Sequence, residues 1–487
     1  MSRLSASAAS AASTFLPLLL IASALPALGN DAASPTVGVS KVRIVRLSEV
    51  KGEVKADLNS GHGFENAMTN LPIVENMRLQ TGAGVAEVEF EDNSTLRLAP
   101  NSVVEFPRLE LLASGAKAST VHVLQGMVYV SLVNTQGNDF TLLFGSRKLQ
   151  LPPSSHVRLE MEPAEAKLAV LDGAIHIDGP SGVVDVPKKK TVTFPLANAG
   201  EPAVARNVEA NQFDSWDHDS ADYHKRFATL SALNSSPYNY GVSDMLYYGA
   251  FSDIGGCGSM WHPYFASASW EPFSNGAWAW YQGAGYTWVS PYPWAWTPYH
   301  SGSWAFCPGA GWGWQPGSTW DGLSNAPSTL IGSGGKIGIL PKPPTRGPLQ
   351  GESTLVAVNL RPLAPSALGA EDAFVFRKDS AGLGVPRGTL GNLNKFSERA
   401  LGHGYAVTPV YSPVSASTID RQRSGPSSTG FVAASPHRGY ALPAASEGSA
   451  ISAERGSSGS GPAISGQSST SLSSAGRMSS GGSSHPH

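Results

Sequence analysis

Residues 270–280 read Trp270-Glu-Pro-Phe-Ser-Asn-Gly276-Ala-Trp278-Ala-Trp280. This stretch recurs 26 residues later as Trp296-Thr-Pro-Tyr-His-Ser-Gly302-Ser-Trp304-Ala-Phe306. A looser copy lies upstream at an offset of 27 residues, with matching positions at Gly249, Phe251, Gly256, Gly258 and Trp261. A period in this range indicates a repeat architecture in which each unit buries its apolar face against its neighbours. We predict a three-copy Trp/Gly-rich β repeat over residues 238–320.

The two better copies each contain an aromatic run, then Asn275-Gly276 or Ser301-Gly302, then a second run. Asn-Gly between such runs favours a hairpin turn, because a type I′ turn needs positive φ at both positions. Tryptophans at alternate positions, such as Trp278 and Trp280, would share one face of a strand. The pattern predicts a small β-meander cross-packed by tryptophan rings.

The N-terminal 29 residues have the layout of a secretory signal peptide. A single charge, Arg3, precedes an apolar core at 15–28, and small residues stand before a cut ahead of Asn30. No later segment reaches about 18 consecutive apolar residues, so we expect no membrane span in the mature protein. We therefore predict an exported protein of the periplasm, the outer envelope surface or the medium.

Export would place the two cysteines, Cys257 and Cys307, in an oxidising compartment where a disulfide can persist. They fall in the first and third copies of the repeat, so a bridge would tie the ends of the array together. The alternative is two free thiols buried in an aromatic core. Two cysteines alone do not make a usual metal site, since ligands normally come in CxxC pairs.

Residues 42–192 alternate apolar and polar positions in short runs, for example at 48–56, 86–90 and 156–161. Period-two runs separated by Gly, Asn and Asp predict half-buried antiparallel strands. About ten strands without a convincing helix between them favour an antiparallel β-sandwich or a flattened β-solenoid. We predict a mainly β fold.

The same residues resemble FecR-type domains. The resemblance rests on Val50-Lys-Gly52-Glu-Val54, on the 77–102 stretch with its Asp92-Asn93-Ser94 turn, on 124–130 and on 171–175. Asn93 stands where the family usually has glycine, which a turn tolerates because Asn also visits positive φ. In the best-known members of that family the domain is the periplasmic half of a membrane-spanning regulator that relays a signal from an outer-membrane receptor. This chain shows neither the cytoplasmic domain nor the retained transmembrane helix of that plan, so the resemblance implies a scaffold or sensory domain.

The aromatic repeat resembles a Trp/Tyr/Gly-rich domain of unknown function found after FecR-type domains in exported bacterial proteins. The matching residues are 288–304 and 311–317 within the region 211–320, and Tyr292, Ala295 and Ser303 depart from the usual pattern. No activity is established for that family. The resemblance therefore implies an envelope location and no reaction.

Residues 211–234 change to a helical period and predict a connecting amphipathic helix. Asp217-His218-Asp219 and His224 raise the alternative of a metal site. Six residues between the histidines fit one helical face poorly, so the helix is expected to present these groups to solvent. We predict no metal.

No sequence motif for catalysis is present, and we predict a non-enzymatic protein without a cofactor. The paired carboxylates Glu87 and Glu89, and likewise Glu91, are expected on the solvent face of a strand. A formal charge of −3 gives no electrostatic case for nucleic acid.

Large aromatic rings on a β surface can stack on sugars or extended peptides. The ligand-binding candidates are Trp270, Trp280, Trp288, Trp296 and Tyr299. The alternative is that most rings form the core of the module and a minority are exposed. The expected partners are envelope polysaccharide or peptidoglycan, or other envelope proteins; a periplasmic component of a FecR-type signalling pathway is a further alternative.

The rest of the chain is poorer in pattern. Residues 321–411 are Gly/Pro-rich and predict only loose structure with a few added strands. Residues 412–487 are rich in Ser and Gly with hardly any aromatics, so they predict a disordered tail.

Overall fold

The structure is a computed structural model, and it describes residues 42–179, 182–197, 200–227, 240–324, 330–332, 341–359 and 373–409. The expected signal peptide and the expected C-terminal tail lie outside these residues. The described part is mainly β, as the sequence predicts. None of its helices is both long and apolar enough to cross a bilayer.

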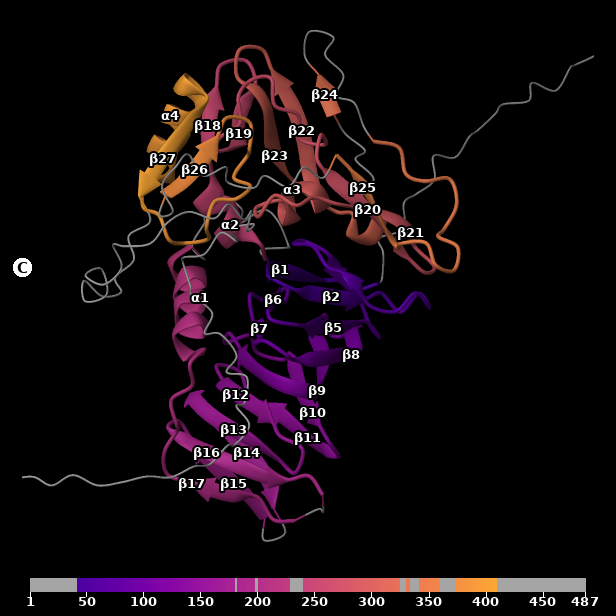
Figure 1. The fold of residues 1–487 in the computed structure, drawn as a ribbon, viewed down its shortest axis with the longest axis vertical. Coiled ribbons are helices and arrows are strands. Elements are labelled where there is room, and N and C mark those ends of the chain that lie inside the picture. The colour runs from indigo at the N-terminus through magenta and orange to yellow at the C-terminus, as the bar shows by residue number, and fades with distance from the viewer. Residues whose placement is uncertain are drawn as a thin grey trace, which may run out of the picture. The chain divides into compact units, whose positions relative to one another are not determined.

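The N-terminal β domain, residues 45–205, is built from short strands (Figure 1). In chain order these are β1 (Val45–Lys51), β2 (Val54–Asp57), β3 (Glu65–Asn66), β4 (Pro72–Ile73), β5 (Arg78–Thr81), β6 (Val85–Glu89), β7 (Thr95–Leu98), β8 (Val103–Leu111), β9 (Lys117–Ser131), β10 (Asp139–Phe144), β11 (Arg147–Leu151), β12 (His156–Met161), β13 (Glu165–Asp172), β14 (Ala174–Gly179), β15 (Gly182–Pro187), β16 (Lys190–Pro195) and β17 (Ala203–Ala205).

The long strand β9 belongs to two sets of strands. Its first part pairs with β8 and, in parallel, with β10, whereas the part after Gly126 pairs with β7 and β12. Gly126 has φ 84°, and a Cβ there would lie 2.5 Å from the Cα of Ser102. Glycine is therefore required where the strand passes from one set to the other. In the second set, the order of neighbouring strands in the sheet is β17-β16-β13-β12-β9-β7-β6-β1-β4.

Two turns follow the predicted chemistry. Gly52, at φ 73°, separates β1 from β2 within the expected opening run, and its missing Cβ leaves room for the backbone of Gly84. Asn93 has φ 67°, and Asp92 Oδ1 accepts a hydrogen bond from the backbone N–H of Ser94. Asn93 thus takes the backbone conformation for which the related domains use glycine.

The aromatic module, residues 240–332, follows the connecting helix α1 (Asp214–Phe227). It comprises α2 (Val242–Tyr248), β18 (Gly249–Ile254), β19 (Gly258–Pro263), β20 (Gly276–Tyr281), β21 (Gly285–Val289), α3 (Trp296–His300), β22 (Ser301–Cys307), β23 (Gly311–Trp320), the 3-10 turn η2 (Gly322–Ser324) and β24 (Leu330–Gly332). The three sequence copies are three β-hairpins, β18–β19, β20–β21 and β22–β23. The repeat of the sequence is therefore a repeat of the structure.

The hairpin turns lie elsewhere than expected. Gly276 opens β20 and Ser301 opens β22, whereas the turns fall on the glycine pairs Gly256/Gly258, Gly283/Gly285 and Gly309/Gly311, all with φ between 79° and 89°. The placement of the turns at Asn275-Gly276 and Ser301-Gly302 was wrong. Trp294 and Trp296 also alternate in the sequence, but they do not share a strand face, because Trp296 begins the short helix α3.

The first glycine of each copy has a packing role. A Cβ on Gly249 would lie 2.3 Å from the ring of Trp261, and one on Gly276 would lie 2.3 Å from the ring of Trp288. In the third copy a Cβ on Gly302 would lie 2.8 Å from Nε1 of Trp314. Each copy thus pairs one glycine with one tryptophan on the neighbouring strand, because the ring occupies the place of a side chain.

The later segment is more ordered than the sequence indicated. It contains β25 (Leu355–Val358), which pairs with β20, and then β26 (Ala373–Arg377), α4 (Leu393–His403) and β27 (Tyr405–Pro409). Phe376 lies 5.5 Å from Phe265, and the backbone N–H of Phe265 donates to Ser397 Oγ. Each short element completes its hydrophobic contacts on the aromatic module, which local sequence patterns do not reveal.

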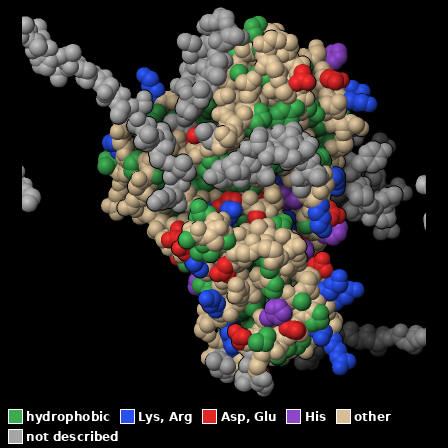
Figure 2. Space-filling view, turned by 180° about the vertical axis from the view of Figure 1, so that it is seen from behind, with side chains coloured by type: hydrophobic (Ala, Val, Ile, Leu, Met, Phe, Trp, Pro, Cys, Tyr) green, Lys and Arg blue, Asp and Glu red, His purple; other side chains and the backbone are tan. Residues whose placement is uncertain are grey.

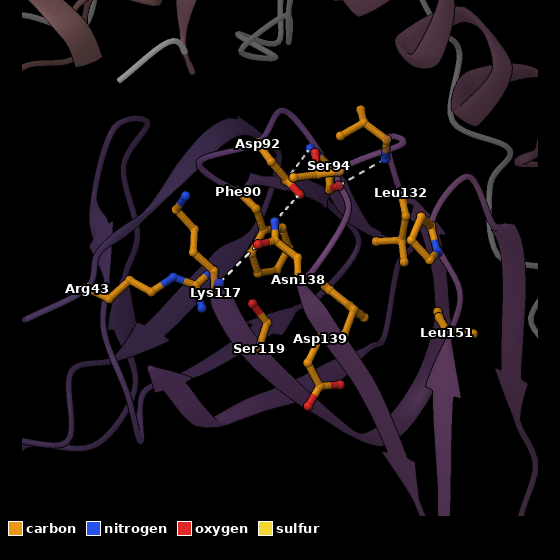
Figure 3. Close-up of a pocket in the computed structure, with 14 residues that line it drawn as sticks. Arg43, Phe90, Asp92, Ser94, Lys117, Ser119, Leu132, Asn138, Asp139 and Leu151 are labelled. Carbon is orange, nitrogen blue, oxygen red and sulfur yellow. Dashed lines mark hydrogen bonds between the residues drawn. The ribbon is translucent and has the colours of Figure 1, made fainter. Parts of the chain in front are cut away.

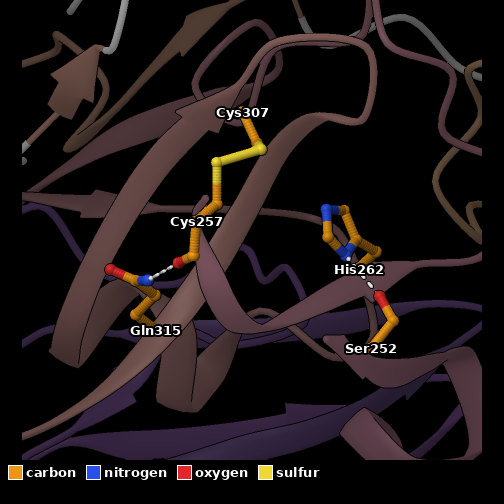
Figure 4. The surroundings of a disulfide bond; sticks show 5 residues. All are labelled: Ser252, Cys257, His262, Cys307 and Gln315. Carbon is orange, nitrogen blue, oxygen red and sulfur yellow. Dashed lines mark hydrogen bonds between the residues drawn. A yellow bond between two sulfur atoms is a disulfide. The ribbon is translucent and has the colours of Figure 1, made fainter. Parts of the chain in front are cut away.

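Cys257 and Cys307 form a disulfide, with their Cα atoms 6.1 Å apart (Figure 4). The bridge joins the turn after β18 to the end of β22, and it closes a loop with a sequence separation of 50. Gln315 Nε2 donates to the carbonyl of Cys257 across the same place. In the chain-entropy account such a closure stabilises the folded state by roughly 4 kcal/mol.

We expect Gly276→Ala to lower the free energy of unfolding by about 1–3 kcal/mol, since the added methyl must displace the Trp288 ring from a packed core. The measurement is urea unfolding of the mature chain followed by circular dichroism. Gly255→Ala is the matched control, because a Cβ at Gly255 meets nothing within 4 Å and its φ is not positive. Equal effects of the two substitutions would contradict the pairing of this glycine with Trp288.

Candidate functional site

The most unusual feature is a buried charge network on the outer face of strands β1, β6 and β7. Arg46, Glu87, Glu89 and Arg97 are each no more than 1% exposed. The alternate residues Ala86 and Val88 of β6 face the hydrophobic core of the β domain. The charged face is covered by α1, by α2 and by residues near Arg387, which supply its ion-pair partners.

Glu87 is the centre of the network. Its carboxylate lies 2.8 Å from Arg97 Nε, 2.9 Å from His224 Nε2 and 2.7 Å from Arg387 Nη1, and it accepts a hydrogen bond from Ser48 Oγ at 2.7 Å. Burial alone would raise the pKa of Glu87, but His224, Arg387 and Arg97 together hold it well below its usual value. The carboxylate is thus kept ionised by partners from the adjacent strand β7, from α1 and from the Arg387 segment.

Arg46 holds the aromatic module to the β domain. Its Nη1 lies 2.9 Å from Glu89 Oε2 and 2.8 Å from Asp244 Oδ2 of α2, and its Nη2 donates to the carbonyl of Pro293. Asn70 extends the same junction by donating to the carbonyls of Ser290 and Tyr292. Burial would raise the pKa of Asp244, but Arg387 and Arg46 lower it.

Helix α1 is anchored at its start. Asp217 lies 2.8 Å from Arg97 Nη1 and 2.8 Å from His156 Nε2, and Asp214 accepts from Tyr129 and Arg158. Burial would raise the pKa of Asp217, but the His156 hydrogen bond and Arg97 lower it. The helix is fixed by ionic contacts in addition to the packing of Trp216.

Two expectations about charged residues were wrong. Glu87 and Glu89 do not face solvent, and the Glu91 side chain is 6% exposed and paired with Arg43. Asp217 and His224 are also buried, whereas His218 and Asp219 of the same helix are exposed. Strand β6 is covered on both sides, so the alternation of apolar and charged residues does not mark a solvent face there. The sequence signal for a buried charged face was one arginine on each strand that pairs with β6, Arg46 on β1 and Arg97 on β7.

The described residues contain no group of three or more His, Cys, Asp or Glu side chains arranged to hold a metal ion. In the network the carboxylates are already occupied by guanidinium and imidazole groups. Its arrangement therefore fixes chain segments to one another.

Most candidate ligand-binding rings lie in the core of the aromatic module. Trp270 is 4% exposed, Trp288 1%, Trp296 0% and Tyr299 7%. Trp270, Trp288 and Tyr299 belong to the aromatic cluster of the module, and Trp296 packs with the β domain core. These four rings can meet a ligand only if the module opens.

Trp280 differs, because its ring is half-buried and lies 4.9 Å from the half-buried ring of Tyr286. One side of the Trp280 ring is covered by Gly347, where a Cβ would approach within 2.7 Å. The two rings are inclined at 63°, so they do not form a flat platform. A ligand-binding role on this face rests on Trp280.

Two cavities of the β domain are lined by other residues than these rings. One of about 20 Å³ lies beside the Asp92–Ser94 turn, where Asn138 connects Asp92 to the backbone of Lys117 (Figure 3). It has room for about one water. A larger cavity of about 430 Å³ lies between β11 and β14.

Comparison with known families identifies two parts of the chain. Residues 77–176 match the family described as FecR protein, and residues 242–345 match a family of unknown function, DUF6600. Both resemblances predicted from the sequence are confirmed, in the predicted order. The Arg387 segment lies outside both matches.

A search of curated proteins finds no match. Two crystal structures of a Parabacteroides distasonis protein, described provisionally as an anti-sigma factor, are 15% and 16% identical to this chain with TM-scores of 0.24. Each match covers 28% of this chain, and the chain spans 63% and 62% of theirs, which is less than two thirds. A similarity of this size carries no conclusion about function.

We expect Glu87→Gln to destabilise the folded chain by about 3–5 kcal/mol, because the amide leaves Arg97 and Arg387 without their shared counter-charge in the interior. Thermal or urea unfolding of the mature protein measures the change. Glu110→Gln is the control, since Glu110 is 53% exposed in its pair with Arg108. If the two variants unfold alike, the network does not stabilise the fold.

His300 adds a pH dependence at the same junction. Its ring lies 4.3 Å from that of Trp296 and 5.3 Å from that of Trp320, and Nδ1 is 2.9 Å from the carbonyl of Gly322. Burial lowers the pKa of His300 to about 4, and Arg46 acts in the same direction. The neutral ring, which donates from Nδ1, is the form that fits.

We expect the free energy of unfolding to fall as the pH is lowered from 6.5 towards 4. In that window the unfolded chain binds a proton at residue 300 and the native chain does not, which is worth up to about 3 kcal/mol. The measurement is unfolding at several pH values, for the native chain and for His300→Gln. The variant should lose this part of the slope, whereas His218→Gln, at a side chain 71% exposed, should keep it.

Proposed function

We propose that this protein is an exported, non-enzymatic scaffold of the cell envelope. In this proposal the FecR domain and the aromatic module act as one unit, and the aromatic rings serve mainly as the core of the module. The observation that carries the proposal is that every tryptophan except Trp280 and Trp320 is buried. A surface that stacks on sugars would need several rings open to solvent.

The surface charge agrees with this proposal. The net charge is −3, and acidic and basic side chains are interspersed over the face seen in Figure 2. Such a surface favours neither nucleic acid nor an anionic membrane as the partner. Other envelope proteins are the partners that the proposal favours, and the FecR match supports a role related to signalling at the envelope.

A carbohydrate-binding function is the second candidate. It is favoured by one observation, the half-buried Trp280 ring beside Tyr286. In this case the ring face of Trp280 would stack on a sugar of envelope polysaccharide or peptidoglycan, near the end of strand β20.

The test is iodide quenching of tryptophan fluorescence, with and without soluble peptidoglycan fragments. The full chain is expressed with its own N-terminus in a bacterium with an outer membrane. If the chain is exported, mass spectrometry should give the mass of a mature protein whose first residue is Asn30. We expect blue-shifted emission, weak quenching and no effect of the fragments, because buried rings exclude iodide.

Trp280→Phe is the control variant, since it removes one accessible indole and keeps an apolar ring. Protection from iodide by the fragments that disappears in Trp280→Phe would contradict the scaffold proposal and establish the carbohydrate-binding one. Retention of the N-terminal residues in a cytoplasmic chain would contradict export.

A further inference from the structure

A strap of irregular structure, residues 381–390, crosses the tyrosines of α1 and α2. Tyr247 donates to the carbonyl of Pro386 and Tyr248 to that of Val385, at 3.1 and 3.0 Å. Gly388 has φ 70°, and a Cβ there would lie 2.7 Å from the ring of Tyr223. The strap is therefore fitted closely to an aromatic surface made by other elements.

The side chain of Arg387 in this strap lies among Glu87, Asp244 and Tyr223, which belong to other elements. Its Nε and Nη2 lie 2.9 and 3.1 Å from the two carboxylate oxygens of Asp244, and its Nη1 lies 2.7 Å from Glu87 Oε1. Its guanidinium carbon lies 4.6 Å from the centre of the Tyr223 ring. His224 Nε2 is 3.5 Å from Nη2.

The geometry of this pocket is selective for a guanidinium group. A fork of two hydrogen bonds to one carboxylate requires a planar group with fixed donors, which lysine lacks. The aromatic face adds a cation–π contact that is strong when water is excluded, and the Arg387 side chain is 10% exposed. The walls come from β6, α1 and α2, which are separate from the strap in the sequence.

The walls also keep partners of their own. Glu87 retains Arg97 and His224, and Asp244 retains Arg46 and the hydroxyl of Tyr223, which donates to it at 2.7 Å. Loss of Arg387 therefore removes one of several cations. The vacated site would present the carboxylates of Glu87 and Asp244 and the ring of Tyr223, in an arrangement that fits a guanidinium group.

We propose that Glu87, Asp244 and Tyr223 form a guanidinium-binding site that Arg387 occupies in cis, and that displacement of the strap opens it to an arginine side chain of a basic peptide. The strap is then an internal competitor for a partner. This inference is independent of the scaffold function, because it concerns a surface that no tryptophan forms.

The test is chemical rescue in the mature full-length chain. In Arg387→Ala, methylguanidinium at millimolar concentration should raise the unfolding midpoint by about 2–4 °C in a saturable manner. Methylammonium at equal ionic strength should not. The native chain, whose site is filled, and Arg346→Ala, at a side chain 58% exposed and paired with Glu352, should show no such rise.

A second ligand distinguishes a partner site from a filled cavity. The tripeptide Gly-Arg-Gly should stabilise Arg387→Ala, and Gly-Lys-Gly should not. If Arg387→Ala does not fold, the same series is run on Arg387→Gln, which is shorter than arginine but keeps a polar side chain. A folded variant that ignores methylguanidinium overturns the site, and one that accepts methylguanidinium but not Gly-Arg-Gly overturns the peptide ligand. Either result leaves the fluorescence test of the scaffold unaffected.

Discussion

A carboxylate loses its hydration when it is taken into a protein interior, and the loss is offset only by cations held close to it. Strand β6 places Glu87 and Glu89 in that position, with side chains fully buried. Among the described residues, the β domain supplies Arg46 and Arg97 to these two groups, and each of these arginines also pairs with an aspartate. Further partners come from α1 and from the strap, through His224 and Arg387. The interior of one domain is therefore completed by residues up to 300 positions away.

This requirement changes where the folding unit ends. The matched regions cover residues 77–176 and 242–345, but the charge network also needs α1, which lies between them, and Arg387, which lies after them. A buried ion pair contributes little net stability, yet removal of one partner leaves an uncompensated charge. The network therefore destabilises states in which α1, α2 or the Arg387 strap is detached from the β domain. It adds less to the stability of the state in which all three are bound. Apolar contacts, such as Tyr281 at the β domain core, supply the attraction.

Local chemistry explains what the sequence could predict. Strand alternation, the turn at Asn93 and the three-copy repeat depend on neighbouring residues, and the structure contains all three. The buried network depends on pairs such as Arg97 and Asp217, 120 residues apart, so the periodicity of β6 alone indicated a solvent face. The turn positions failed for a different reason. Asn-Gly is a common turn sequence, but Gly276 is required here because the ring of Trp288 occupies the space of a side chain.

The glycine–tryptophan pairs also explain why an aromatic repeat need not be a binding surface. Each indole lies where a neighbouring side chain would otherwise stand, so its ring faces are covered by protein once the hairpin forms. A module of short hairpins has few other apolar residues, and large rings give it enough buried area to fold. The tryptophans of the glycine–tryptophan pairs are therefore covered for the same reason that they recur. The guanidinium site that we propose lies outside these pairs, under Arg387, where β6, α1 and α2 meet.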